Sequence, residues 1–260
     1  MSRQHGRTVV NRYETHEEAS EAAAEAFVRL ANEAVEERGR FTVALAGGDV
    51  PELLYSLLGQ EPRRSRIPWD SVHLFWGDDR CVPPAHPRSN FGMAAEAFVN
   101  GIPIPEDQVH RMRGEDDPEE AARAYESDVR DVLGDEPRFD LMHLGVGDDA
   151  HTASLFPYDH GALLERERLV IPTFFRELGE YRITLTLPVI NRSRYIEVLV
   201  TGREPAPAVK AAIEGPLDPF RLPIQLVRPV EDGEMVWMLT PESAARLEPD
   251  APAAHSTPAR

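Results

Sequence analysis

The chain has 260 residues and carries 28 basic against 45 acidic side chains, a formal net charge of −17. This balance argues against nucleic acid or an anionic membrane as a partner, because both select for basic surfaces. A single cysteine, Cys81, excludes an intramolecular disulfide, and there is neither a signal-peptide core nor an apolar run long enough to span a membrane, so we expect a cytoplasmic protein.

Helices and strands alternate along the chain. Thr15 and Glu18 form a capping box that predicts a helix ending at Arg38. Proline at the first turn predicts helices beginning at Pro51 and at Pro118, the latter capped by Asp117. The predicted strands cover residues 41–47, 72–77, 139–147, 183–190, 195–202 and 235–240. The predicted helices after the first cover residues 51–58, 89–99, 118–133 and 206–214, and one or two helical turns are predicted over 241–247.

The predicted strands are almost continuously apolar, and most are followed by a helix. This pattern is typical of a parallel sheet whose two faces are both covered. The sequence therefore predicts an α/β fold with a mostly parallel sheet and helices on both faces, in a single domain over residues 1–247. Residues 248–260, EPDAPAAHSTPAR, are rich in proline and alanine and are expected to form a disordered tail.

Most of the negative charge falls on two predicted helices. Residues 14–38 hold eight acids and two arginines, and residues 115–136 hold ten acids and two arginines. Together these segments contribute −14 of the −17. The acidity is thus mainly that of two solvated helix faces, and an anionic small-molecule substrate is not excluded.

Three predicted strands end in polar loops that contain glycine, and such loops meet at the carboxyl edge of a parallel sheet, where ligands bind. The first loop is AGGDVP, residues 46–51. Gly47 and Gly48 allow the backbone to approach a ligand closely, and the following helix N-terminus suits an anion. The alternative is a tight turn with Asp49 as the N-cap, and the Asp49 carboxylate would oppose an anion at that helix end.

The second loop, residues 76–90, carries an arginine just beyond a strand end. Arg80 has Asp79 as a neighbour, and a guanidinium suits phosphate or carboxylate groups. Ser89 and Asn90 then open a helix. The alternative is a proline-rich surface loop with incidental charges.

The third loop, residues 145–157, places His151 after a glycine-rich strand end, with Asp149 two positions before it. This arrangement fits a general base whose tautomer is fixed by an acid. The alternative is a hydrogen-bonded surface histidine, but the position beside two similar loops favours the base. His73 and His143, inside predicted strands, are interpreted as structural.

Two further arginines lie at strand ends. Arg182 precedes the predicted strand 183–190, and Arg203 follows the strand 195–202. Each either binds an anion or pairs with an acidic neighbour. No cysteine and histidine spacing typical of a zinc site occurs, so no metal site is predicted.

The chain resembles the 6-phosphogluconolactonase family over residues 40–240. The resemblance is carried, in order, by AGGDVPELLYSLL, WDSVHLFWGDDRCVPPAHPRSNFGMA, FDLMHLGVGDDAHTASLFP, RITLTLPVINRSRYIEVLVTG and AVKAAIEGP. It implies a Rossmann-like sheet related to that of glucosamine-6-phosphate isomerases. It also implies hydrolysis of 6-phospho-D-glucono-1,5-lactone to 6-phospho-D-gluconate, in the oxidative pentose phosphate pathway, without a metal or an organic cofactor.

The resemblance also implies roles for individual residues. His151 takes the position of the general base that activates water, and Asp149 that of the acid in the same motif. Arg80 and Arg182 would hold the phosphate or stabilise the developing oxyanion. The remaining implied pocket residues are Gly47, Gly48, Ser89, Asn90 and, as a replacement cation, Arg203.

The chain departs from the family pattern near the expected anion site. Asp49 and Val50 stand where a hydroxyl pair is usual, Pro205 where a lysine is common, and Ala150 where glycine is usual. A positive φ at Ala150 would cost about 1 kcal/mol. These departures keep two alternatives open: a non-catalytic sugar-phosphate-binding relative, and a sugar-phosphate isomerase or deaminase of the related fold.

Overall fold

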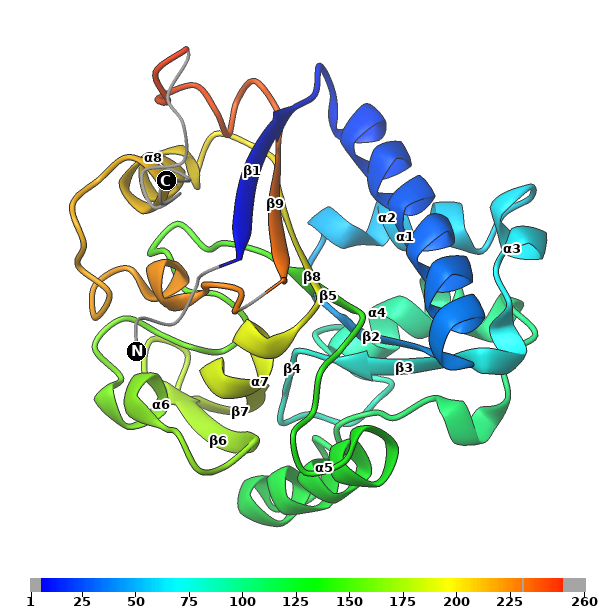
Figure 1. Ribbon diagram of the computed structural model, residues 1–260. Helices are drawn as coiled ribbons and strands as arrows, with labels where there is room; N and C mark the ends of the chain where they lie inside the picture. The colour runs from blue at the N-terminus through cyan, green and yellow to red at the C-terminus, as the bar shows by residue number, and fades with distance from the viewer. Residues whose placement is uncertain (1–5, 231, 250–260) are drawn as a thin grey trace.

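The computed structural model describes residues 6–230 and 232–249. Its centre is a six-stranded sheet in the order β1-β9-β8-β5-β2-β3, in which every pair of neighbouring strands is parallel (Figure 1). The predicted mostly parallel sheet is therefore confirmed. Its strands are β1 (Arg7–Arg12), β2 (Phe41–Leu45), β3 (Val72–Trp76), β5 (Leu141–Leu144), β8 (Tyr195–Val200) and β9 (Glu234–Leu239).

Helices cover both faces of this sheet, as predicted. One face packs against α1 (His16–Arg38), α2 (Val50–Leu58) and α4 (Asn90–Ala97). The other packs against α5 (Pro118–Leu133), α6 (His160–Leu164), α7 (Leu187–Arg192) and α8 (Ala206–Ile213). The short α3 (Arg63–Arg66) follows α2, and single 3-10 turns lie at Trp69–Ser71, Val99–Gly101, Glu106–Gln108 and Pro223–Leu226. None of the described helices is long and apolar enough to cross a membrane.

The inner strands of the sheet are mostly apolar because both of their faces are buried. On β2, Val43 belongs to the core beneath α1 and α2, whereas Ala44 belongs to the core beneath α5. Every residue of β2 is buried. This is the reason that the sequence shows a continuous apolar run rather than an alternation.

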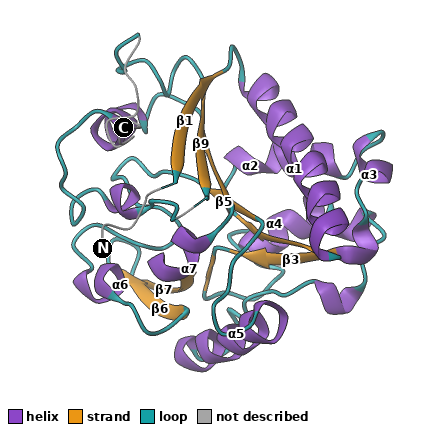
Figure 2. Cartoon of the chain, in the orientation of Figure 1, coloured by secondary structure: helices purple, strands orange, loops and turns teal. Residues whose placement is uncertain are grey.

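A second, antiparallel sheet of three strands lies beside the main one, in the order β4-β7-β6. It consists of β4 (Asp78–Arg80), β6 (Val170–Phe175) and β7 (Glu180–Leu185), and Figure 2 shows β6 and β7 beside α7, away from β1 and β9. Only Gly77 separates β3 from β4, so one stretch of chain passes from the first sheet to the second. Arg80 and Arg182 are register partners there, which brings two arginines predicted for the site together.

The predicted starts of α1 and α5 are confirmed, and α2 begins at Val50, one residue before the predicted Pro51. The Thr15 side chain accepts a hydrogen bond from the Glu18 backbone N–H at 3.1 Å, and α1 begins at the next residue, His16. The Glu18 carboxylate, however, accepts from the N–H of Glu14 rather than that of Thr15, so only half of the expected capping box forms. Asp117 caps α5 by accepting from two backbone N–H groups.

The predicted strand 183–190 is wrong in its second half. The strand β7 ends at Leu185, and residues 187–192 form α7 instead. Pro188 lies in the first turn of α7, where its fixed φ favours a helix and its missing N–H costs nothing. The run is apolar because Leu187, Val189 and Ile190 are buried, which does not distinguish a strand from a short buried helix. Strand β7 also belongs to the small antiparallel sheet rather than to the parallel one.

Three strands were not predicted. β4 has only three residues, all charged, and β6 contains Pro172, which an edge strand tolerates. β1 is a six-residue edge strand, RTVVNR, that pairs with β9, the last strand of the described residues. Residues 241–247 form turns rather than a helix. Most of the predicted tail, residues 250–260, lies outside the described residues.

Candidate active site

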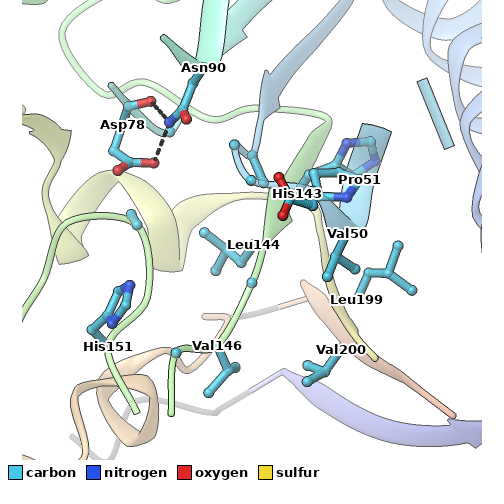
Figure 3. A pocket seen from close by; sticks show the side chains of 18 of the residues that line it. Val50, Pro51, Asp78, Asn90, His143, Leu144, Val146, His151, Leu199 and Val200 are labelled. Atoms are coloured by element: carbon cyan, nitrogen blue, oxygen red, sulfur yellow. Dashed lines mark hydrogen bonds between the residues drawn. The ribbon is translucent and has the colours of Figure 1, made fainter. Parts of the chain in front are cut away.

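A pocket of about 310 Å³ opens at the carboxyl edge of the parallel strands. The loops after β2, β3, β5 and β8 all contribute to it. The strand order reverses between β5 and β2, and in open α/β sheets such a reversal is where loops diverge and ligands bind. Of the residues predicted for the site, the structure brings six to this pocket: Gly47, Gly48, Arg80, Asn90, His151 and Arg182. Figure 3 shows two of them, Asn90 and His151.

His151 forms a close pair with Asp149, although Asp149 does not itself line the pocket. His151 Nδ1 lies 2.6 Å from Asp149 Oδ1, and the His151 backbone N–H donates to the same oxygen at 2.9 Å. Burial favours the neutral acid, but the hydrogen bond and charge of His151 outweigh it and lower the pKa of Asp149. An ionised Asp149 holds the proton on Nδ1, which leaves the Nε2 lone pair free to accept one.

The loop that carries this pair depends on Gly147. A Cβ at Gly147 would lie 2.2 Å from His151 Nδ1 and 2.8 Å from Asp149 Oδ1, closer than any real contact. The imidazole ring therefore packs directly on the glycine. Ala150 has a φ of 69°, so it adopts the left-handed conformation at a cost of about 1 kcal/mol for a residue with a side chain.

Arg80 is held by polar contacts at the second loop. Its Nη1 donates to the Arg88 carbonyl at 2.8 Å and to Asn90 Oδ1. Asn90 in turn donates to the Asp78 carbonyl at 2.8 Å (Figure 3). A Cβ at Gly47 would lie 1.8 Å from Asn90 Oδ1, so this glycine permits a close approach to a protein side chain.

Ser89 does not line the pocket. Its hydroxyl caps α4 by accepting from the Gly92 N–H at 3.0 Å. Beside it, Asp79 accepts from the backbone N–H groups of Arg80, Asn90 and Phe91. Burial raises the pKa of Asp79 to about 6 against the opposing effect of these hydrogen bonds. Ser89 and Asp79 thus fix the start of α4 and the position of Asn90.

Arg182 reaches the pocket from β7 with only 8% of its surface exposed. It pairs with Glu180 at 2.9 Å, and its guanidinium lies over the rings of Phe156 and Phe175. Glu180 also pairs with Arg88, so one carboxylate bridges two arginines. The three charges together remain positive by one unit, which favours an anion in their vicinity.

Arg203 does not have the position, and Asp49 does not make the contact, that the sequence predicted for it. Arg203 is exposed and lies outside the pocket lining, although Thr201 and Pro205 on either side belong to it. Asp49 occupies the N-cap position of α2 but makes no capping hydrogen bond through its side chain, which is exposed. Asp49 is therefore the N-cap residue that the alternative predicted, but its side chain does not cap the helix.

Three buried polar residues of the pocket were not predicted for it. Asp78 accepts a hydrogen bond from the Ser154 hydroxyl at 2.6 Å and holds Asn90. His143 and Glu197 line the inner end. A glutamate within the apolar strand YIEVLV is the one sequence signal that marks the last of these.

In the described ranges, no three histidine, cysteine, aspartate or glutamate side chains are grouped so that they could hold a metal ion. Much of the remaining pocket wall is apolar. Its aliphatic members are Val50, Leu54, Leu144, Val146, Leu199 and Val200.

Comparison with known proteins identifies relatives over most of the chain. The 6-phosphogluconolactonase of Synechocystis sp. is 39% identical over 221 residues, which cover 83% of this chain and 88% of the relative. That of Haemophilus influenzae is 35% identical over 205 residues, covering 79% and 86%.

The fold is shared with solved structures. The 6-phosphogluconolactonase from Trypanosoma cruzi superposes with a TM-score of 0.81 at 27% identity, covering 95% of this chain and 99% of that one. A monomeric glucosamine-6-phosphate deaminase superposes with a TM-score of 0.75 at 21% identity, covering 91% and 99%, and shares the fold. The family model described as glucosamine-6-phosphate isomerases/6-phosphogluconolactonase matches residues 14–237, and the chain belongs to this family.

Proposed function

We propose that the chain hydrolyses 6-phospho-D-glucono-1,5-lactone to 6-phospho-D-gluconate in this pocket, with His151 as the general base. The lactonase activity is supported by relatives of that name that match most of both chains. The observation that carries the role of His151 is its 2.6 Å contact with Asp149 at the pocket wall. The reaction belongs to the oxidative pentose phosphate pathway, and we propose the cytoplasm as its compartment.

The chemistry follows from the pair. Water attacks the lactone carbonyl carbon while Nε2 of His151 takes its proton, and the ionised Asp149 stabilises the resulting imidazolium. The tetrahedral intermediate bears an oxyanion, which a nearby guanidinium stabilises. The bond between the carbonyl carbon and the ring oxygen then breaks, and His151 returns the proton to the departing oxygen. One water is consumed, and His151 ends as it began.

The arginines supply the charge that the substrate requires. The positive charge nearest to the pocket is carried by Arg80 and Arg182. Glu180 bridges Arg182 to Arg88. We assign the phosphate or the oxyanion to Arg80 and Arg182, with Arg203 as an outer contact. Gly47, Gly48, Ser89 and Asn90 support Arg80 and the pocket wall. We propose no nucleic acid or membrane partner, because the net charge of −17 opposes both.

The test is a comparison of two substrates with the purified chain. We expect accelerated loss of 6-phosphogluconolactone and no ammonia release from glucosamine-6-phosphate. Lactone hydrolysis is monitored by coupling the formation of 6-phosphogluconate to its dehydrogenase. Ammonia release would favour the deaminase. Stabilisation by 6-phosphogluconate without any turnover of the lactone would favour a non-catalytic sugar-phosphate-binding protein.

A further inference from the structure

Two buried polar residues at the inner end of the pocket, His143 and Glu197, have no part in the reaction described above. They are direct neighbours in the sheet, since His143 on β5 is the register partner of Glu197 on β8. Their side chains are 4% and 1% exposed, and His143 Nε2 lies 3.6 Å from Glu197 Oε1. Both residues line the pocket.

The side chains of His143 and Glu197 have three polar atoms without a hydrogen-bond partner in the described part of the chain. His143 Nε2 and both carboxylate oxygens of Glu197 have no hydrogen-bond partner among the described residues. Unpaired polar atoms in a protein interior are costly, and an ionised carboxylate costs more there than a neutral acid, so this environment favours a protonated Glu197.

No cation balances Glu197 from the elements packed around it in the described chain. The titratable groups that face it are His143 on β5, Tyr55 on α2, Tyr195 on β8 itself and Tyr13 ahead of α1. Its register partner on β9 is the apolar Val236. The exposed Asp49, on the pocket lining, adds negative charge. An ionised Glu197 would therefore be a buried charge facing only neutral or acidic groups.

Burial sets the charge of the pair. It raises the pKa of Glu197 to about 8 and lowers that of His143 to about 3. At neutral pH the pair is thus a carboxylic acid beside a neutral imidazole. A proton on Glu197 Oε1 would face Nε2 of His143 across 3.6 Å, and a neutral ring with its lone pair on that side carries its own proton on Nδ1.

A line of polar contacts connects this pair to the glycine loop. His143 Nδ1 lies 3.4 Å from the Tyr55 hydroxyl, and the two rings stack with centroids 5.8 Å apart. The Tyr55 hydroxyl donates to the Ala46 carbonyl at 3.0 Å and accepts from the Ala46 N–H at 2.8 Å. Ala46 is the first residue of the loop that continues through Gly47 against Asn90.

We propose that Glu197 and His143 are positioning residues that form an uncharged acid–imidazole pair. The pair holds the pocket wall formed by residues 46–48 through Tyr55. It also keeps the inner end of the pocket free of negative charge, so that an anionic sugar phosphate can bind. This inference rests on the proposed function, which supplies the anion. When Glu197 loses its proton, a poorly screened negative charge arises at the pocket, and it repels a phosphate dianion.

The test is the affinity for 6-phosphogluconate, measured by titration calorimetry at pH 7 and pH 9.5. The second phosphate pKa is near 6, so the phosphate stays a dianion across this range. We expect the wild-type Kd to rise roughly tenfold between the two pH values through the added repulsion. Glu197→Gln keeps the shape and removes the titration, so its Kd should stay nearly constant.

Glu234→Gln is the matched control, because Glu234 lies on the neighbouring strand β9, 32% exposed and paired with Arg7. It should keep the wild-type pH dependence. A wild-type Kd that does not change, or a Glu197→Gln Kd that rises in parallel with it, overturns the inference. Failure of 6-phosphogluconate to bind the wild type at pH 7 counts against the proposed function instead.

The unfolding temperature gives a second readout that needs no ligand. Unfolded Glu197 ionises near its ordinary pKa of 4.5, whereas the folded state keeps the proton to about pH 8. Between these values the folded state binds more protons, so wild type loses stability relative to Glu197→Gln as the pH rises, and the difference levels off above pH 8. Unfolding temperatures that run parallel from pH 5 to pH 8 overturn the assigned charge state.

Discussion

His151→Ala is expected to lower kcat for 6-phosphogluconolactone hydrolysis by about 10³-fold, which is the usual contribution of a general base. The variant loses the group that takes the proton of the attacking water, whereas the arginines and the pocket wall remain. KM should therefore change much less than kcat. The measurement is the initial rate in the coupled assay, corrected for spontaneous hydrolysis of the lactone.

His160→Ala is the control for this variant. His160 is exposed at the start of α6, where it packs against Phe220. Its removal should leave the rate within about twofold of wild type, as is usual for a surface substitution away from the site. Equal rates for wild type and His151→Ala would contradict the assignment of the base.

Gly147→Ala is expected to lower kcat by about 10²-fold with an unfolding temperature close to that of wild type. The added methyl group would lie 2.2 Å from His151 Nδ1, so the ring must move away from Asp149 and from the water that it activates. A displacement of about 1 Å at a catalytic group is enough for a loss of this size. The imidazole is 28% exposed, which gives it room to move without unfolding the loop.

Gly101→Ala is the matched glycine control, because a Cβ at Gly101 would meet nothing within 4 Å. It should retain wild-type kcat. The two variants differ in what the methyl group touches rather than in the type of substitution. Full activity of Gly147→Ala would show that the close packing of His151 on this glycine is not needed for the reaction.

The alternation of elements was sufficient to predict the parallel sheet, the two helical faces and the limits of α5. Residues close together in the sequence are sufficient to predict these elements. Asp117 caps α5 through the backbone N–H groups that follow it, and the apolar residues 41–45 form one buried strand. The run RITLTLPVI was misassigned because an apolar stretch with one proline fits a strand or a short buried helix equally well. Strand β1 was missed because it exists only through pairing with β9 at the other end of the chain.

The same distinction holds for the site. The three loops could be predicted because parallel strands bring their carboxyl ends together. The contact of Gly47 with Asn90 and the bridge of Glu180 between Arg88 and Arg182 depend on side-chain packing between distant segments. The pairing of His143 with Glu197 required the order and register of β5 and β8, which sequence patterns do not contain.

A structure of the protein with 6-phosphogluconate bound tests the proposed mechanism most directly. The product carboxylate should lie within hydrogen-bond distance of Nε2 of His151, because the carboxylate carbon is the former lactone carbonyl carbon that water attacks. The phosphate should lie on the side of Arg80 and Arg182. A product carboxylate remote from His151, with the phosphate occupying the position beside the imidazole, would contradict His151 as the base.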